Sequence, residues 1–391
     1  MLRAVLAPRK LLAFALLAFF LFYWIPFSNV FPGWVPLQFG SYRVFQATTI
    51  AMWAILVLGL NLLTGYNGQI SLGHGAFVAV GAYTAAILMF DHNWPFWATI
   101  PVGGLITGAI GFAVGVPALR LTGPYLAIAT LALAMSTPQI LQKYEGLTHG
   151  SQGINVQSPP PPAILDGVLN STQWIYFLAL VIAIVMTVIA WNIVHSRVGR
   201  AFVAIRDSEI ASQAMGISVP RFKTMAFAIS AFYAGVCGAL YIQVIGFVSP
   251  QSFGVIQSIN YLTTIVVGGL ATILGSILGA AAFVLVPETN TLLRDVFHLP
   301  VAAQAPGLIY GASLILVMIF MPYGFAGFIR RLTRLQPPLV RQSLADFSRR
   351  IGLRLGTARA APTGDSGAGA TPPKDVPNSH PPDEGKGSGS S

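Results

Sequence analysis

The sequence predicts an all-helical protein that crosses a membrane several times. Of its 391 residues, 54% are hydrophobic and only 9% are charged, whereas soluble domains contain about 25% charged residues. No charged residue occurs from Leu11 to Tyr42, from Val44 to Phe90 or from Thr224 to Pro287. A helix needs about 20 apolar residues to span a bilayer, so each run can hold one or more spans. A single soluble core is excluded.

Apolar stretches between turn-forming residues predict about ten membrane-spanning helices. They lie at about 11–27, 43–63, 69–90, 96–118, 121–141, 173–195, 223–246, 253–270, 273–291 and 304–323. The first span follows Arg3, Arg9 and Lys10 and so resembles a secretory signal. No small-residue cleavage site precedes Pro26, and we therefore expect an uncleaved anchor.

The basic residues predict that both termini lie in the cytoplasm. Lys and Arg gather in cytoplasmic loops because positively charged segments resist export. With the N-terminus inside, only Arg43, Lys143 and Arg294 fall on the outer side. The net charge of +10 is thus interpreted as a topology signal, not as the mark of a nucleic-acid partner. The block of spans two to five then begins outside, whereas the block of spans seven to ten begins inside. If the two blocks are related, they form an inverted repeat.

The chain is expected to consist of a membrane domain, residues 1–329, followed by two cytoplasmic segments. Residues 330–360 are rich in arginine, and apolar residues recur among them at three- and four-residue steps. That pattern is typical of an amphipathic helix lying on membrane lipid, although a solvated basic tail fits equally well. Residues 361–391 are rich in Gly, Pro and Ser and should be disordered, because they cannot bury enough apolar surface.

The first candidate for function is a glycine-rich stretch, residues 65–77, which reads GYNGQISLGHGAF. Irregular backbone at membrane depth persists only where it is buried in protein or lines a wet cavity. Two interpretations stay open. The polar residues Asn67, Gln69, Ser71 and His74 line a transport pathway, or the glycines are packing contacts and His74 is hydrogen-bonded to a neighbour. A single histidine between glycines gives no metal site.

A second glycine cluster, residues 267–280, lies where span eight should turn into span nine at the cytoplasmic face. It contains a G-x-x-x-G motif from Gly275 to Gly279, which allows close approach of two helices. We predict tight packing there. The single cysteine, Cys237, has no partner in the chain and is expected to be a small core residue.

The cytoplasmic loop at residues 196–222 is the second candidate for function. It mixes charged with apolar residues, and a helix is predicted within it that ends at Gly216, a favourable C-cap residue. Pro220 is expected to block helix resumption before the next span. A helix that offers charge and apolar surface to the cytoplasm, and is anchored by spans at both ends, suits docking to a soluble partner. A helix lying on lipid headgroups is the alternative.

The composition disfavours other classes of membrane protein. Ion-coupled carriers place Asp, Glu or His at mid-membrane, whereas here His74 is alone and Glu288 lies at the outer end of a span. An ion-coupled carrier or facilitator for small polar solutes remains the alternative function. The only Gly-Lys pair, Gly385–Lys386, lacks the spacing of a Walker motif, so any ATP must be hydrolysed by another polypeptide. No cluster of acids, bases, nucleophiles or metal ligands occurs at membrane depth, and we predict no catalytic residue, metal or cofactor.

Two long stretches carry a family resemblance. Residues 59–86 read GLNLLTGYNGQISLGHGAFVAVGAYTAA, and residues 196–218 read SRVGRAFVAIRDSEIASQAMGIS. They resemble the permease subunits of ATP-binding-cassette importers for branched-chain amino acids, in particular the M-type subunit. The resemblance covers residues 40–330. It departs from the family pattern in the second glycine cluster, where Ala271 and Ser276 replace a glycine and a proline.

The resemblance implies an importer subunit in the bacterial inner membrane. Its partners would be a homologous second permease, two cytoplasmic ATP-binding-cassette ATPases and an extracytoplasmic solute-binding protein. The loop helix would couple the permease to the ATPases through Arg206, Asp207, Glu209, Ala211 and Gly216.

A translocation pathway for an amino acid needs only weak polar contacts, because tight binding would stall release. The candidates for this lining are Asn67, Gln69, Ser71, His74 and Thr130. The outer loop, residues 142–172, contains the stiff sequence SPPPPA and is either a docking surface for the binding protein or a rigid spacer.

Overall fold

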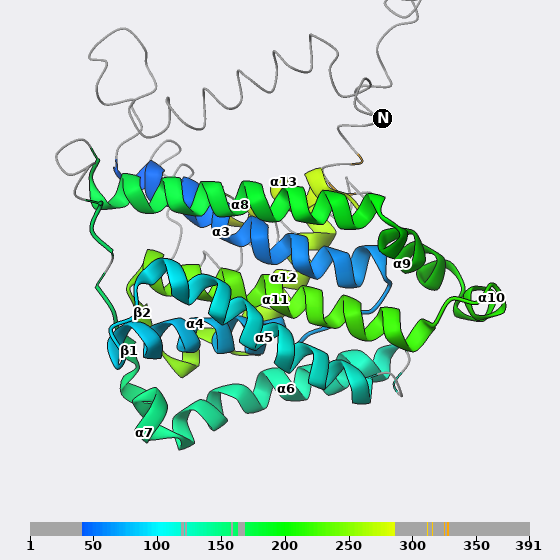
Figure 1. Ribbon diagram of the computed structural model, residues 1–391, viewed down its shortest axis with the longest axis horizontal. Helices are drawn as coiled ribbons and strands as arrows, with labels where there is room; N and C mark the ends of the chain where they lie inside the picture. Colours follow the sequence, from blue (N-terminus) through cyan, green and yellow to red (C-terminus); the bar gives the residue numbers. More distant parts are fainter. Residues whose placement is uncertain are drawn as a thin grey trace, which may run out of the picture. The chain divides into compact units, whose positions relative to one another are not determined.

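The computed structural model describes residues 41–285, except 119, 120, 122, 158 and 163–168, and the isolated positions 311, 315, 324 and 327. The predicted first and tenth spans and the segments 330–360 and 361–391 lie outside these residues, apart from the isolated positions. The described residues form a bundle of helices (Figure 1).

Each predicted span from the second to the ninth corresponds to a helix. Five helices of the described region are long and apolar enough to cross a membrane: α3 (Ser41–Asn61) with its continuation η4 (Leu62–Tyr66), α5 (Phe96–Ala118), α6 (Pro124–Lys143), α8 (Ser171–His195) and α11 (Val219–Ile245). Three shorter helices occupy the other predicted spans: α4 (His74–Phe90), α12 (Val255–Gly268) and α13 (Ile273–Leu285). An all-helical polytopic architecture is thereby confirmed, while the total of ten spans stays a prediction.

Helix α11 lies at the centre of the bundle and packs most extensively against α5, α4 and α3. Small residues allow this close approach, since a side chain on Gly81 would overlap with the backbone of Gly235. Tyr233, which is 1% exposed, donates from its hydroxyl to the carbonyl oxygen of Met186 in α8 at 2.8 Å. Cys237 is fully buried, as predicted for a core residue.

The second glycine cluster forms the α12–α13 hairpin. A Cβ on Gly268 would overlap with the carbonyl of Gly275, and one on Gly279 would overlap with the carbonyl of Thr264. The predicted tight packing at the G-x-x-x-G motif is thus confirmed. The turn contains Ala271 in the left-handed region, at φ 55°.

The third predicted span is interrupted at its start. The expected helix at 69–90 begins only at His74, and residues 67–73 have no regular secondary structure. They follow η4, a π-helix, which is a rare form that often marks functional sites. We call residues 67–73 the discontinuous segment. It joins α3 to α4, and its residues alternate between buried and exposed from Asn67 to Ser71.

The loop at 196–222 contains two helices where one was predicted: α9 (Arg197–Asp207) and α10 (Glu209–Ala214). Extended backbone at Ser208 separates them, and its hydroxyl accepts a hydrogen bond from the Ala211 amide at 3.2 Å, as an N-cap does. Gly216 ends the segment at φ 80°, as predicted.

The expectation for Pro220 was wrong, because this proline lies in the first turn of α11, where its missing N–H has no intrahelical partner to lose. Both α9 and α10 project from the end of the bundle at which α8 ends and α11 begins (Figure 1).

Short elements lie at the opposite end of the bundle (Figure 1). The predicted outer loop, residues 142–172, holds α7 (Glu145–Thr148), the 3₁₀ helix η5 (Gly150–Gln152) and strand β1 (Ile154–Asn155). Strand β1 pairs antiparallel with β2 (Phe247–Val248), with Ile154 opposite Val248. The 3₁₀ helix η6 (Pro250–Phe253) leads into α12. This two-residue pairing is the one departure from an all-helical chain within the described residues.

Candidate functional site

The discontinuous segment is fixed by backbone contacts at its start and its end. The amide of Gln69 donates to the carbonyl oxygen of Leu63 at 3.1 Å, and the hydroxyl of Thr64 donates to the Gln69 carbonyl at 3.0 Å. At the other end, the amide of Leu72 donates to the hydroxyl of Thr130 in α6 at 2.9 Å. Thr130 therefore does lie beside the polar residues with which the sequence analysis grouped it.

The start of α4 is packed between two neighbouring helices. His74 Nε2 lies 2.7 Å from the hydroxyl of Ser230 in α11, and the amide of Gly75 donates to the hydroxyl of Ser258 in α12 at 2.9 Å. A Cβ on Gly75 would approach that hydroxyl to 2.6 Å. These contacts favour the packing interpretation for the glycines and for one nitrogen of His74.

Some polar atoms of the segment are left without such contacts. All the predicted pathway residues are buried, with exposed fractions between 0% and 8%. Both side-chain polar atoms of Asn67, Oε1 of Gln69 and Nδ1 of His74 have no hydrogen-bond partner among the described residues. Burying a polar group without a partner is unfavourable, so such groups call for an explanation. A passing polar solute is the partner that the pathway interpretation supplies.

Helix α9 is anchored to the bundle through one apolar face. Ser196 caps it by accepting from the Val198 amide at 3.1 Å. Phe202 is fully buried and meets Phe222 of α11 edge to face, with ring centroids 6.4 Å apart. This aromatic contact packs α9 against the start of α11.

The predicted coupling residues differ in what they contact. Arg206 donates through Nη1 to the carbonyl oxygen of Gly65 at 3.0 Å, and through Nε and Nη2 to Asp207 Oδ1 at 3.2 and 3.1 Å. Glu209 accepts from Nζ of Lys223, whose side chain is 8% exposed. These three charged residues thus have partners inside the chain. Ala211 and Gly216 are exposed, and open space surrounds Gly216.

Two apolar residues, one in α10 and one at its C-cap, were missing from the predicted site. Ile210 and Met215 are each 83% exposed, the highest values among the large apolar residues described. They lie among charged residues at the end of the bundle where the chain is expected to meet the cytoplasm. Apolar patches exposed on a surface occur at protein and membrane interaction sites, which makes these two side chains candidates for one. The signal in the sequence was their position within a charged loop.

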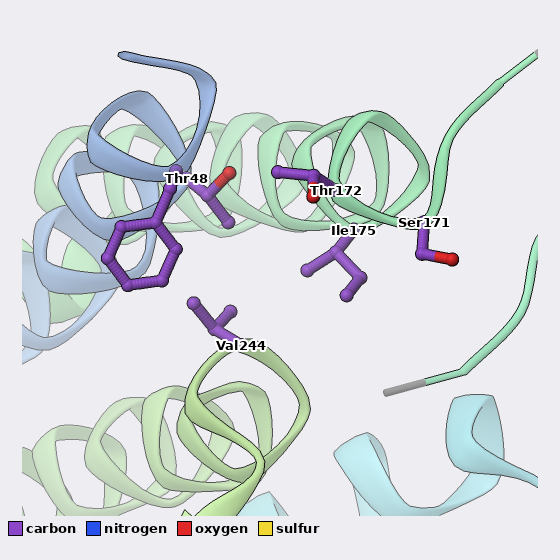
Figure 2. Close-up of a pocket in the computed structure, with 6 residues that line it drawn as sticks. Thr48, Ser171, Thr172, Ile175 and Val244 are labelled. Carbon is purple, nitrogen blue, oxygen red and sulfur yellow. The ribbon is translucent and has the colours of Figure 1, made fainter. Parts of the chain in front are cut away.

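Among the described residues, hollows lie at the end of the bundle opposite α9 and α10. The first, of about 100 Å³, lies between α3, α8 and α11, and Figure 2 shows Thr48, Ile175 and Val244 among its lining residues. The second, of about 480 Å³, lies beside β1 and is lined by Met89, Phe90, Asn93, Trp94, Asn155, Val156 and Gln157. Neither is lined by a charged side chain. Among the described residues, no group of three or more His, Cys, Asp or Glu could hold a metal ion.

Comparison with known proteins identifies the family. A family model described as branched-chain amino acid transport system / permease component matches residues 42–319. The high-affinity branched-chain amino acid transport system permease protein LivM of Salmonella typhimurium is 34% identical over 311 residues, covering 74% of this chain and 71% of the relative. LivM of Escherichia coli is 33% identical over 312 residues, with the same shares of both chains.

A second kind of relative is more distant. The permease protein LivH of Salmonella typhimurium is 25% identical over 309 residues, covering 73% of this chain and 94% of the relative. No solved structure matches the chain. These matches confirm the resemblance found in the sequence, and the chain belongs to the family of branched-chain amino acid transport system permease components.

Proposed function

We propose that this chain is the permease subunit of an ATP-driven importer of branched-chain amino acids, and that α9 and α10 form its docking surface for a cytoplasmic ATPase. The observation that carries the proposal is the exposed pair Ile210 and Met215 on a helix pair fixed to the bundle. Apolar side chains that are buried on binding dominate the energetics of an interface, and charged residues at the rim add specificity.

The other subunits of the importer are proposed from the family to which the chain belongs. The names of LivM and LivH describe two permease proteins of high-affinity branched-chain amino acid transport. This chain would pair with a homologous second permease, two ATP-binding-cassette ATPases and an extracytoplasmic binding protein, in the bacterial inner membrane. Ten spans with both termini inside, and an inverted repeat of spans, remain part of the proposal.

The pathway is proposed to run along the discontinuous segment. Unpartnered polar atoms at Asn67, Gln69 and His74 support this, because a zwitterionic amino acid brings both donors and acceptors to such groups. Ser71 and Thr130 would contribute hydroxyl groups. The glycines on either side of His74 pack closely against Thr130 and Ser258.

An ion-coupled carrier is the second candidate function, and the described spans give it little support. No Asp or Glu occurs within α3, α4, α5, α6, α8, α11, α12 or α13. Coupling ions usually need such residues at membrane depth. Uptake into vesicles that follows a proton or sodium gradient without any ATPase would decide in favour of the carrier.

The docking surface is tested by replacing Ile210 and Met215 together with alanine. Interface anchors commonly contribute about 2 kcal/mol or more each, so co-purification of the ATPases should be lost. Gln213→Ala is the matched control, because Gln213 is an exposed polar residue of the same short helix. Equal ATPase binding by the double variant and the control would refute the docking surface.

A further inference from the structure

The geometry at the cytoplasmic end of α3 singles out Arg206 among the residues of α9. Its guanidinium donates to the carbonyl oxygen of Gly65 in η4 at 3.0 Å. The last carbonyls of a helix lack partners inside the helix, and a positive charge near them is favourable. Asp207 accepts two hydrogen bonds from the same guanidinium and so holds its orientation.

The aliphatic part of Arg206 also touches the discontinuous segment. Gly68 has φ 81°, and a Cβ built on it would lie 2.8 Å from Cγ of Arg206 and 3.3 Å from its Cβ. The arginine therefore contacts the chain on both sides of the point where the helix stops. It joins α9 directly to residues 65–68.

Gly65 in turn packs closely against the side chain of Asn61 in α3. A Cβ at Gly65 would overlap with Oδ1 of Asn61, which is 1% exposed. Asn61 Oδ1 accepts from the amide of Ala271 at 2.9 Å, and its Nδ2 donates to the carbonyl of Thr272 at 2.9 Å and to the hydroxyl of Ser276 at 2.8 Å. Contacts therefore run without a gap from Arg206 to the α12–α13 turn.

The far end of the discontinuous segment reaches three more helices. Leu72 contacts α6, His74 contacts α11 and Gly75 contacts α12, each through the hydroxyl hydrogen bond described above. A displacement of residues 65–68 would consequently be felt at α4, α6 and α12. Close-packed joints of this kind shift between discrete arrangements rather than deforming continuously.

We propose that Arg206 is a positioning residue that passes movement of α9 to the discontinuous segment, and that it does so as an internal link and not as a contact for the ATPase. The inference rests on the proposed function, in which α9 and α10 receive the ATPase. It separates two tasks within these helices. Ile210 and Met215 bind the partner, whereas Arg206 connects α9 to the pathway.

The first test compares Arg206→Gln with Arg200→Gln in the complete transporter reconstituted in vesicles. Arg200 lies on the same helix and also donates to a carbonyl oxygen at 3.3 Å, but that oxygen belongs to His195 of α8 rather than to residues 65–68. Both variants should co-purify with the ATPases. Coupling free energies between sites typically correspond to a factor of 5 to 150, so we expect uptake per ATP hydrolysed to fall roughly tenfold in Arg206→Gln alone.

Ile70 provides a readout of movement in the segment itself. It is 47% exposed, and the native Cys237 is fully buried. A thiol reagent should therefore label Ile70→Cys selectively, at a rate that changes when ATP and vanadate are added to the complex. That change should disappear when Arg206→Gln is introduced and persist with Arg200→Gln.

The outcomes separate this inference from the proposed function. Failure of the unaltered chain to retain ATPases would refute the proposed function. If Arg206→Gln alone loses the ATPases, Arg206 is a docking contact and the inference is overturned. If Arg206→Gln and Arg200→Gln show the same uptake per ATP and the same labelling change, the link is not needed, and the inference is overturned as well. If Arg206→Gln does not insert, Arg206→Lys replaces it, because lysine keeps the charge but not the forked geometry. The inference would also be overturned if Arg206→Lys matched Arg200→Gln in uptake per ATP hydrolysed and in the change of the Ile70→Cys labelling rate.

Discussion

Residues 65–77 and residues 267–280 are the two glycine-rich joints of the chain, and they differ in how their polar atoms are satisfied. At the second joint, the hydroxyl of Thr272 donates to the Gly269 carbonyl and that of Ser276 lies between Asn61 and Thr272. At the first joint, Asn67 and one atom each of Gln69 and His74 lack partners among the described residues.

The comparison shows that glycine content alone does not distinguish a joint that serves helix packing from one that serves function. Glycines permit close approach at both joints. The first joint additionally carries polar groups that packing does not need. An unsatisfied buried polar group lowers stability, and these atoms are the ones on which the proposed pathway rests.

The largest expected effect is that of Gly268→Val, which should disrupt the packing of α12 against α13 at the second joint. The new side chain would overlap with the carbonyl of Gly275, and because backbone atoms cannot yield as a side chain does, we expect destabilisation of about 3 kcal/mol or more. The midpoint of thermal unfolding in detergent measures this. Gly146→Ala is the control, as open space surrounds Gly146. A thermal midpoint equal to that of the control would show that α12 and α13 are not closely packed.

The connection between the two joints is tested by Asn61→Leu. This change leaves the Ala271 amide without its partner and removes one of the hydrogen bonds to the Thr272 carbonyl, which keeps the Ser276 amide, so the free energy of unfolding should fall by about 2 kcal/mol. Ser276→Ala removes the hydroxyl that accepts from Asn61 and donates to the Thr272 carbonyl, but leaves the Asn61 bond to Ala271 in place, and should cost about 1 kcal/mol. If both variants lose equal stability, Asn61 does not hold the joints together.

Asn67→Leu tests whether the polar residues of the first joint serve transport rather than stability. Replacing an unpartnered buried amide by an apolar side chain of similar size should leave stability within about 1 kcal/mol. Uptake of leucine by the reconstituted transporter should nevertheless fall, because a pathway group is lost. Ser258→Ala provides the contrast, since it removes a packing hydrogen bond to Gly75 and should mainly lower stability. Full uptake by Asn67→Leu would remove Asn67 from the proposed pathway.

The smallest effect concerns the residue by which the second joint departs from the family pattern. Ala271 is held at φ 55°, where residues other than glycine are strained, so Ala271→Gly should raise the free energy of unfolding by about 0.5 kcal/mol. Ala280→Gly, within α13, should lower it by roughly 1 kcal/mol. A decrease for Ala271→Gly would show that the left-handed conformation is not strained.

Local sequence patterns predicted much of the fold. Apolar runs located the spans, and the glycine at 216 correctly marked a helix end. The break at Ser208 was missed, although a serine followed by Glu209 in the first turn is itself a helix-start signal. The role of Pro220 was wrong because the same residue that stops one helix can begin the next.

The candidate site was harder to predict than the fold. The polar residues of the first joint stood out because polarity is rare in a span. Their partners could not be found this way, since His74 and Ser230 lie 156 residues apart in the chain. Likewise, no local pattern shows that Arg206 faces Gly65 rather than the cytoplasm. Such contacts depend on which helices the bundle brings together.

The short length of α4 has a consequence for the thickness of the surrounding lipid. Its 17 residues cover about 26 Å at 1.5 Å per residue, less than the roughly 30 Å of a bilayer core. Backbone without helical hydrogen bonds spans the rest. Extended chain can cover twice the distance per residue, and small torsional changes alter its reach. Residues 67–73 are therefore long enough to complete the crossing for which α4 alone is too short.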